Sequence, residues 1–332
     1  FLLQHASRGS GGLADILRLG VELAKTGLKV SYVPVGGGDV AKMTENILWT
    51  NDAVRREQVV SALPFVPEYV CATAWPTAYK ALAQPSRRKL YFVQDYEPWF
   101  HPAGVSRWYA ERTYELGLEM FTLGPWLTHH LRTVHDDVRV TPMPFPAGDS
   151  PEVGRTLRER RRIAFYLQPD KEHRGTELVL ETASRLSSRM QAKQANAEIV
   201  LFGAPENEYL KPGFPCTVLG VLGEAELTAL FRKTRVGFCA SFTNVSLVTF
   251  RYLSSGCLAV DLDLPNVTKN IPGSAISLIR CCPPDPESAV EAIEHCWDFD
   301  PAPGLRERCV RELAEEHSWS ACAAALKKAG IV

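Results

Sequence analysis

The sequence alternates short apolar runs with helical patterns, and this alternation occurs twice. It begins with an apolar run at residues 2–5 and a helical pattern at residues 13–25. After a segment rich in proline, TPMPFPAGDSPEVG, it restarts with residues 163–167 and 175–191. Strands that alternate with helices predict parallel, doubly wound sheets. The fold class expected is therefore α/β, with two Rossmann-like domains that face each other across a cleft.

The length supports this division, because 332 residues are more than one ordinary core holds. We predict an N-terminal domain at residues 1–147, a linker at 148–162 and a C-terminal domain at 163–317. In open α/β sheets, ligands bind at the carboxyl ends of the strands, so the loops there are the candidate sites. A start at Phe1 rather than Met leads us to expect a piece of a longer chain.

Composition excludes several classes of protein. The net charge of −1 gives no strong field for nucleic acid, and no apolar run approaches the roughly 18 residues of a membrane span. Nine cysteines occur without a CxxC motif or metal-ligand spacing, which predicts buried, reduced thiols in a cytoplasmic protein.

Two loops of the first half carry candidate chemistry. RGSGG, with Gly11 and Gly12, joins a strand to a helix but lacks the GxGxxG spacing, so two interpretations remain: a tight turn, or a loop that faces a sugar or phosphate. YFVQDYEPWF ends a strand with Gln94, Asp95 and Glu97 beside aromatic rings. That combination suits carbohydrate, although two solvated acids on a surface turn would look the same.

Four patterns of the second half have competing interpretations. Arg174 is either a diphosphate clamp or a solvated loop charge, and TNVS (residues 243–246) either caps a helix or adds an anion site to it. We interpret DLD (residues 261–263) as a strand-end loop rather than a metal site. The basic run RTLRERRR (residues 155–162) predicts a solvated face, or alternatively a membrane-surface patch.

Four motifs together resemble the retaining glycosyltransferases of the GT-B fold, glycosyltransferase family 4. They are similar above all to the rhamnosyltransferases that assemble bacterial surface polysaccharides. The motifs are GSGGLADILRLGVELAKTGLKV, YFVQDYEPWFHPAGVSRWYAERTYELG, FYLQPDKEHRGTELVLE and SFTNVSLVTFRYLSSGCLAVDLDLPN. The terminal EEHSWSACAAAL resembles the family's last helix, which returns to the first domain, here within residues 318–332.

The resemblance implies a mechanism that needs no metal or other cofactor. A nucleotide-diphosphate sugar would bind the C-terminal domain, and a glycan or lipid-linked glycan would dock on the N-terminal domain. Asp95 and Arg174 would carry the catalytic roles. The implied donor-binding residues are Gln168, Arg174, Gly220, Val221, Thr243, Asn244, Val245, Ser246, Leu247 and Arg251. The implied acceptor-binding residues are Gly11, Gly12, Gln94, Asp95 and Glu97.

Three positions depart from the family pattern. The usual glutamate pair, spaced E-x7-E, falls on Thr243 and Arg251, and the usual arginine of the phosphate clamp falls on Gln168. Two hypotheses follow. The chain is a sugar transferase with an altered donor grip, in the cytoplasm or peripheral at the inner face of the membrane. Alternatively, it is a weakly active or inactive module that binds a glycan or a partner transferase within a larger protein.

Overall fold

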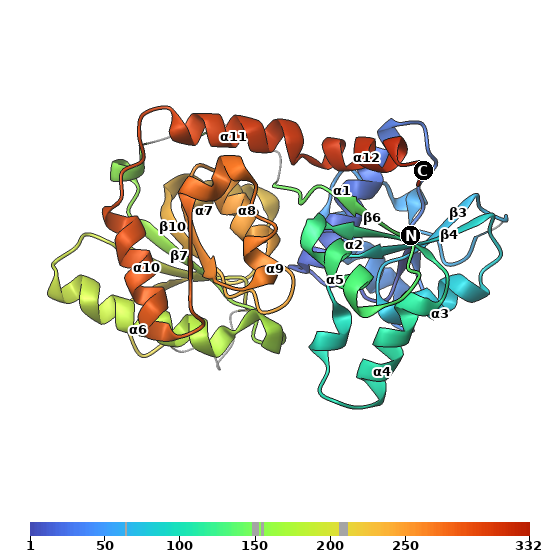
Figure 1. Ribbon diagram of the computed structural model, residues 1–332, viewed down its shortest axis with the longest axis horizontal. Coiled ribbons are helices and arrows are strands. Elements are labelled where there is room, and N and C mark those ends of the chain that lie inside the picture. The colour runs from blue at the N-terminus through green and yellow to red at the C-terminus, as the bar shows by residue number, and fades with distance from the viewer. Residues whose placement is uncertain (64, 148–152, 154–155, 206–211) are drawn as a thin grey trace. The chain divides into compact units, whose positions relative to one another are not determined.

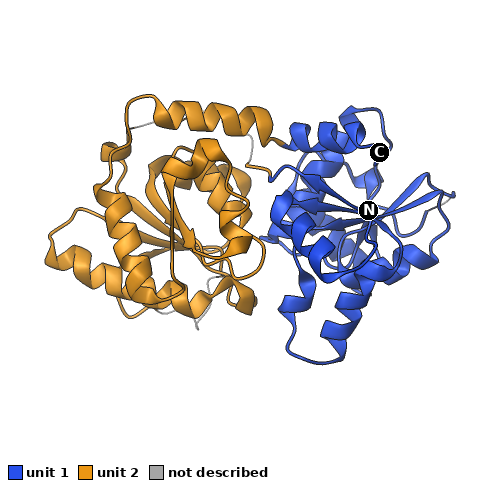
Figure 2. Cartoon of the chain, in the orientation of Figure 1, with its two compact units in different colours: residues 1–145, 319–332 blue, residues 146–318 orange. Residues whose placement is uncertain are grey.

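The computed structural model describes residues 1–63, 65–147, 153, 156–205 and 212–332, and the chain divides into two compact units. Unit 1 comprises residues 1–145 and 319–332, and unit 2 comprises residues 146–318 (Figure 2). Of the expected linker at 148–162, residues 148–152 and 154–155 lie outside the described residues. The remainder of that segment belongs to unit 2.

Unit 1 is built on parallel strands with helices packed against them (Figure 1). Its four-stranded sheet has the order β3-β4-β5-β6, and β1 pairs with β2. The Thr73 hydroxyl, just after β3, donates to the carbonyl of Leu2 in β1 over 2.6 Å. The strands are β1 (Leu2–Leu3), β2 (Val33–Pro34), β3 (Tyr69–Ala72), β4 (Arg88–Val93), β5 (Glu119–Leu123) and β6 (Val140–Met143). The α-helices are α1 (Gly11–Lys25), α2 (Val40–Thr50), α3 (Trp75–Ala83), α4 (Val105–Arg112), α5 (Gly124–Val134) and α12 (Trp319–Lys328).

Helix α1 shows how the local sequence sets an element. Ser10 caps it, because the Ser10 hydroxyl accepts a hydrogen bond from Leu13 N–H over 3.4 Å. Its apolar residues recur on one face and are buried, and Gly27, at φ +98°, follows its end. The C-terminal helix α12 packs beside α1 in Figure 1, so the end of the chain completes unit 1.

In the described part of unit 2, six parallel strands form a sheet with the order β12-β11-β10-β7-β8-β9. The strands of its centre are buried nearly throughout, as parallel strands covered by helices on both faces must be. Its strands are β7 (Arg162–Tyr166), β8 (Glu198–Phe202), β9 (Thr217–Val218), β10 (Thr234–Phe238), β11 (Leu258–Leu262) and β12 (Ile279–Cys282). Its α-helices are α6 (Thr176–Ala192), α7 (Glu224–Lys233), α8 (Leu247–Ser254), α9 (Pro265–Thr268), α10 (Pro286–Asp298) and α11 (Leu305–Glu316).

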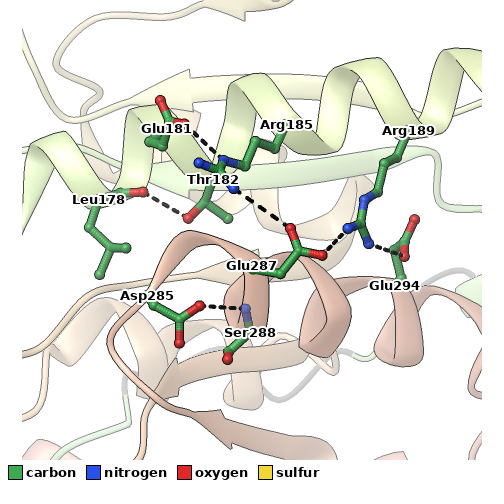
Figure 3. Close-up of polar contacts among 9 residues, drawn as sticks. All are labelled: Leu178, Glu181, Thr182, Arg185, Arg189, Asp285, Glu287, Ser288 and Glu294. Atoms are coloured by element: carbon green, nitrogen blue, oxygen red, sulfur yellow. Dashed lines mark hydrogen bonds and ion pairs between the residues drawn. The ribbon is translucent and has the colours of Figure 1, made fainter.

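Helices α6 and α10 are joined by an ion-pair network on their exposed sides (Figure 3). Arg189 pairs with both Glu287 and Glu294, and Lys193 Nζ lies 2.9 Å from Glu294 Oε1. Pairs this exposed contribute only about 0.2–1 kcal/mol each. The two helices are therefore held mainly by their buried faces.

Gly237 in β10 has no space for a side chain. A Cβ built there would lie 2.3 Å from the ring of Tyr252, whose hydroxyl donates to Ala164 O over 3.1 Å. We expect Gly237→Ala to lower the free energy of unfolding of unit 2 by about 1–3 kcal/mol, the cost of overpacking a filled core. Urea unfolding measures it. Gly273→Ala is the control, because nothing lies within 4 Å of a Cβ at that position; equal midpoints for the two variants would contradict the prediction.

The structure differs from the predicted elements in a few places. The apolar pattern of residues 277–279 predicts a strand, but a 3-10 helix spans Gly273–Leu278 and β12 begins only at Ile279. The sequence pattern also predicts no helix at residues 40–50, where the Asp39 side chain caps α2. The sequence pattern predicts a helix at residues 106–118, but α4 ends at Arg112 and a 3-10 turn, Thr113–Glu115, follows it.

The prediction that the basic run is a solvated face is wrong for Arg160. Its side chain is buried, with 1% of the residue exposed. Its Nη1 donates to the carbonyls of Phe231, Thr234 and Ser255 over 3.1–3.3 Å, and its Nη2 donates to Val153 O. The carbonyls of Phe231, Thr234 and Ser255 lie at the carboxyl ends of α7 and α8, where the helix dipole favours a cation. Arg158 is exposed, as predicted.

Candidate active site

The strand order of unit 2 marks one position for a ligand. Strand β7 lies between β8 and β10, so the chain leaves the sheet in opposite directions at the carboxyl ends of β7 and β10. Ligands of open α/β sheets bind in the crevice that such a switch point creates. The segments that follow these two strands are residues 167–175 and residues 239–246.

These two segments contact each other directly. Phe242 N–H donates to His173 O over 3.3 Å, and Arg174 Nη1 donates to Asn244 O over 3.1 Å. Gly175 has φ +55°, and a Cβ there would lie 2.6 Å from the Phe242 ring. The close approach of the two segments therefore requires glycine at position 175.

The helices that follow these segments, α6 and α8, both begin at the switch point. Their amino ends carry partial positive charge and favour an anion. Arg174 adds a guanidinium with the geometry to bind phosphate oxygens bidentately. Burial lowers the pKa of neighbouring His173 to about 3, helped by Arg174 and Lys171, so that His173 is neutral near pH 7.

The structure assigns a structural role to the side chains of the predicted TNVS motif. Thr243, Asn244, Val245 and Ser246 are all buried. Ser246 caps α8 by accepting from Val248 N–H, and the Asn244 side chain accepts from Val245 N–H over 3.0 Å. Several backbone N–H groups at the start of α8 already donate hydrogen bonds to oxygen atoms of the protein. An anion there would therefore be attracted mainly by the partial charge of the helix end and by Arg174, and less by free N–H donors.

The remaining predicted donor residues lie near this site or along α7 and α8. Gln168 opens the turn after β7, and its N–H donates to Thr176 Oγ1 over 3.3 Å. Gly220, at φ +68°, accepts from Gly203 N–H over 2.8 Å and precedes Val221. Leu247 opens α8.

Arg251 lies in the second turn of α8 and pairs with α7. Its Nη2 lies 2.5 Å from Glu224 Oε1, and its guanidinium packs over the Phe231 ring at 5.4 Å. This side chain therefore bonds to a carboxylate that the sequence motifs did not single out. Glu224 has a largely exposed side chain and stands at the first position of α7.

Two further residues at this site escaped the sequence reasoning. Phe242 is the exposed side chain of the 241–246 loop, with 37% of its surface accessible. Asp261 was predicted in a strand-end loop, but it lies inside β11 and is completely buried. The sequence signal that could have indicated its burial is the strand LAVDL, in which Asp261 is the single polar residue.

In unit 1, the predicted acceptor residues gather at the carboxyl edge of the sheet. Gln94 follows β4, and its Oε1 would lie 3.3 Å from a Cβ at Gly12, so α1 begins against the Gln94 side chain. Gly11 has open space around it. Asp95 is buried, and its Oδ1 accepts from Tyr96 N–H over 2.8 Å.

Glu97 has a different environment from the one predicted. Its Oε2 accepts from Trp75 N–H over 2.5 Å and from the Tyr91 hydroxyl over 3.2 Å, so the carboxyl group caps α3 from within the core. Burial raises the pKa of Glu97 to about 8, and the nearby Asp95 adds to the rise. Glu97 is therefore mostly protonated near pH 7, and we assign it a structural role.

This raised pKa predicts a pH dependence of stability. The pKa of Glu97 is higher in the folded than in the unfolded chain. The contribution of protonated Glu97 to the free energy of unfolding is therefore fully present below about pH 4.5 and is lost as pH rises through about 8. The free energy of unfolding should fall across this window by up to about 1.4 kcal/mol per pH unit. Glu97→Gln should flatten this part of the profile in urea unfolding between pH 5 and 8.5. A control variant at an exposed acid of α2, Glu45→Gln, should keep the wild-type slope; a parallel slope in Glu97→Gln would refute the assignment.

Large aromatic side chains are exposed just beyond Glu97. Trp99, Phe100, Trp108 and Tyr109 lie on the 3-10 turn at Glu97–Phe100 and on α4. The Trp108 and Tyr109 rings meet edge to face, and Arg112 stacks over Trp108. Aromatic faces of this kind suit the C–H surfaces of sugars.

Among the described residues, no group of three or more His, Cys, Asp or Glu side chains could hold a metal ion. In the same part of the chain, no helix is both long and apolar enough to cross a membrane.

Comparison with known proteins gives one relative by sequence and several by structure. No protein-family model matches the chain. It is 34% identical over 218 residues to the O-antigen biosynthesis protein RfbC of Myxococcus xanthus, an alignment that covers 64% of this chain but 17% of RfbC. The chain thus corresponds to a small part of that relative.

The structural neighbours cover both units. The chain superposes on HepE of Anabaena, solved with UDP-glucose, with a TM-score of 0.71 at 9% identity, covering 100% of this chain and 99% of HepE. It also matches WaaG, a glycosyltransferase involved in lipopolysaccharide biosynthesis, with a TM-score of 0.64 at 11% identity, covering 100% and 98% of the two chains. These similarities confirm the α/β fold class predicted from the alternating pattern and the GT-B fold implied by the resemblance: the chain has the GT-B fold of glycosyltransferases.

Proposed function

We propose that the chain is a glycosyltransferase that moves a sugar from a nucleotide-diphosphate donor to a growing surface glycan. The observation that carries this proposal is the switch point of unit 2, where Arg174 and the amino ends of α6 and α8 converge. The glycan-related names of RfbC and WaaG and the UDP-glucose bound to HepE support the same class of reaction.

Arg174 and the two helix ends would hold the donor diphosphate. As the bond between sugar and diphosphate breaks, negative charge grows on the leaving phosphate, and a fixed guanidinium stabilises it. Gly220 and Val221 would border the base, because Gly220 has no side chain to prevent the approach of a flat ring. We propose that no metal is needed, since these groups already supply positive charge.

The acceptor would dock on unit 1 beside Asp95, Gln94, Gly11 and Gly12. Glu97 leaves this set because its carboxyl group caps α3. The exposed aromatic rings of Trp99 and Trp108 extend the surface on which a glycan could stack. Retention at the anomeric carbon and L-rhamnose as the sugar remain parts of the proposal, carried over from the family resemblance.

A second candidate function is a weakly active or inactive module that binds glycan or a partner transferase. Neither of the two positions where the family has glutamate provides a carboxylate for a donor. Thr243 is buried, and Arg251 is paired with Glu224. A neutral and a cationic side chain at these positions would weaken binding of the nucleotide ribose, whose hydroxyls a glutamate would otherwise accept hydrogen bonds from. This arrangement leaves the glycan-facing surface of unit 1 unchanged.

Calorimetric titration without metal tests the first function. The panel is dTDP-rhamnose, UDP-glucose, GDP-mannose and the free diphosphates. We expect one nucleotide to bind, and incubation of that donor with acceptor glycans should release the free diphosphate. Absence of binding by every member to the folded chain would overturn the first candidate. Binding without turnover would favour the second.

A further inference from the structure

We infer that Asp261 is a positioning residue, one that fixes the 241–246 loop for a nucleoside diphosphate without touching it. The inference rests on the proposed function for the identity of the ligand. The positioning itself rests on hydrogen bonds within unit 2. Nothing in the proposed mechanism uses Asp261.

The buried carboxylate accepts hydrogen bonds from three elements. Its Oδ1 accepts from the backbone N–H of Ser241 over 3.0 Å and of Leu262 over 2.8 Å. Its Oδ2 accepts from the hydroxyl of Ser241 over 2.9 Å and from that of Thr249 over 2.7 Å. One side chain of β11 therefore holds both the start of the loop and the first turns of α8.

Ser241 transmits this restraint to the helix end. Its hydroxyl donates to Asp261 and accepts from Ser246 N–H over 3.0 Å, so a chain of two hydrogen bonds joins the carboxylate to the residue that caps α8. Hydrogen bonds in such chains polarise and strengthen one another in a buried setting. A charged acceptor at the end of the chain makes the links stronger than neutral ones.

Two asparagines complete the support from the same side. Asn266 Nδ2 donates to Ser241 O over 2.9 Å, and Asn270 Nδ2 donates to Asn244 Oδ1 over 2.9 Å. From the opposite side, Arg174 donates to Asn244 O. The loop is thus held between Arg174, which would meet the diphosphate, and three buried side chains that would not. Asp261 is the charged member of the three.

Ionisation of Asp261 should then affect donor binding. Burial raises the pKa of Asp261 to about 6, although its hydrogen bonds oppose the rise. The titratable groups that interact with it are Cys239, which follows β10, Tyr252 of α8, and Cys281 and Cys282 of β12. Asp263 interacts with the same two thiols of β12. Burial raises the pKa values of the thiols and of the tyrosine, so these groups stay neutral between pH 5 and 8.

Two variants and one matched control test the inference. Asp261→Asn keeps the shape but removes the charge, and Ser241→Ala keeps the charge but removes the link to Ser246. Asp263→Asn is the control, because Asp263 lies two residues away in the same DLD motif and is exposed. A thermal melt establishes that each variant is folded.

The first readout needs no ligand. Hydrogen exchange of the peptide that covers residues 241–250 should be about ten-fold faster in Asp261→Asn and Ser241→Ala than in wild type and Asp263→Asn. Unchanged exchange in both variants would overturn the inference. This result is independent of whether the chain binds nucleotide.

The second readout is the affinity for UDP and dTDP by calorimetry between pH 5 and 8. We expect affinity about ten-fold lower in Asp261→Asn at pH 7.5, the effect of one charge-assisted hydrogen bond. Below about pH 6 Asp261 becomes protonated in the wild type, so the ratio of wild-type to Asp261→Asn affinity should shrink. Titration of the nucleotide itself affects both proteins equally and cancels in this ratio. A constant ratio, or equal affinities, would overturn the role in binding. If wild type binds neither nucleotide, the proposed function fails, and the exchange data alone decide whether Asp261 fixes the loop.

Discussion

Arg160→Ala should lower the free energy of unfolding of unit 2 by about 3–5 kcal/mol. The substitution removes a guanidinium that satisfies the buried carbonyls of Phe231, Thr234 and Ser255, and it leaves a cavity of nearly the size of the side chain. Unpaired carbonyls at two helix ends also lose a favourable cation. In a unit of this size the change corresponds to roughly 6–20 °C in the melting temperature.

The neighbouring arginine provides the control for this measurement. Arg158 is two residues away in the same basic run, but its side chain is 77% exposed and pairs with Asp300. Arg158→Ala should cost less than about 1 kcal/mol. Calorimetry or urea unfolding compares the two variants directly. Similar melting temperatures for both would show that Arg160 contributes no more than a surface charge.

The fold could be predicted because its pattern is local. Each buried parallel strand must be apolar on both faces, and each helix that covers the sheet must repeat its apolar residues at helical spacing. Strand β7 and helix α6 satisfy these rules within their own residues. Helix α2 escaped because its few buried side chains are separated by polar ones.

The roles of individual charges could not be predicted, because distant residues decide them. Three of the carbonyls that accept hydrogen bonds from Arg160 are 71, 74 and 95 positions away in the sequence. Asp261 bonds to Ser241, 20 positions away, and Glu97 bonds to Trp75, 22 positions away. Nothing near Arg160 in RTLRERRR distinguishes it from Arg158. Burial of a charge therefore becomes visible only when the whole unit is folded.

The positions of the candidate loops at strand ends could be predicted from the sequence, but the surroundings of their side chains could not. Strand ends at 94–95 and 241–246 were expected to carry function, and the structure brings the second of these against Arg174. Sequence reasoning assigned Thr243 and Asn244 to the ligand, but the structure buries both side chains. Loop geometry depends on supports such as Asp261 and Asn270, which lie outside the motif.

Arg174→Ala should reduce affinity for the nucleotide diphosphate by about 10–100-fold and abolish sugar transfer. In the proposed mechanism, the lost interaction is a charge-assisted hydrogen bond, worth about 1.5–3 kcal/mol, at the position where the leaving phosphate gains charge. Arg174→Lys should retain part of the affinity, because an ammonium keeps the charge without bidentate geometry. Calorimetry with the best nucleotide of the panel measures the first effect, and release of free diphosphate measures the second.

A second arginine of the same unit separates this local effect from a change in net charge. Arg185 lies further along α6, where its Nε bonds to Glu181 over 2.8 Å and its Nη1 lies 3.7 Å from Glu287 (Figure 3). Arg185→Ala removes the same charge from the same helix region but leaves the switch point unchanged, so affinity should stay within about two-fold of wild type. If Arg174→Ala also bound the nucleotide as wild type does, the diphosphate would have to be held elsewhere. If both variants lost affinity equally, long-range charge rather than Arg174 would account for binding.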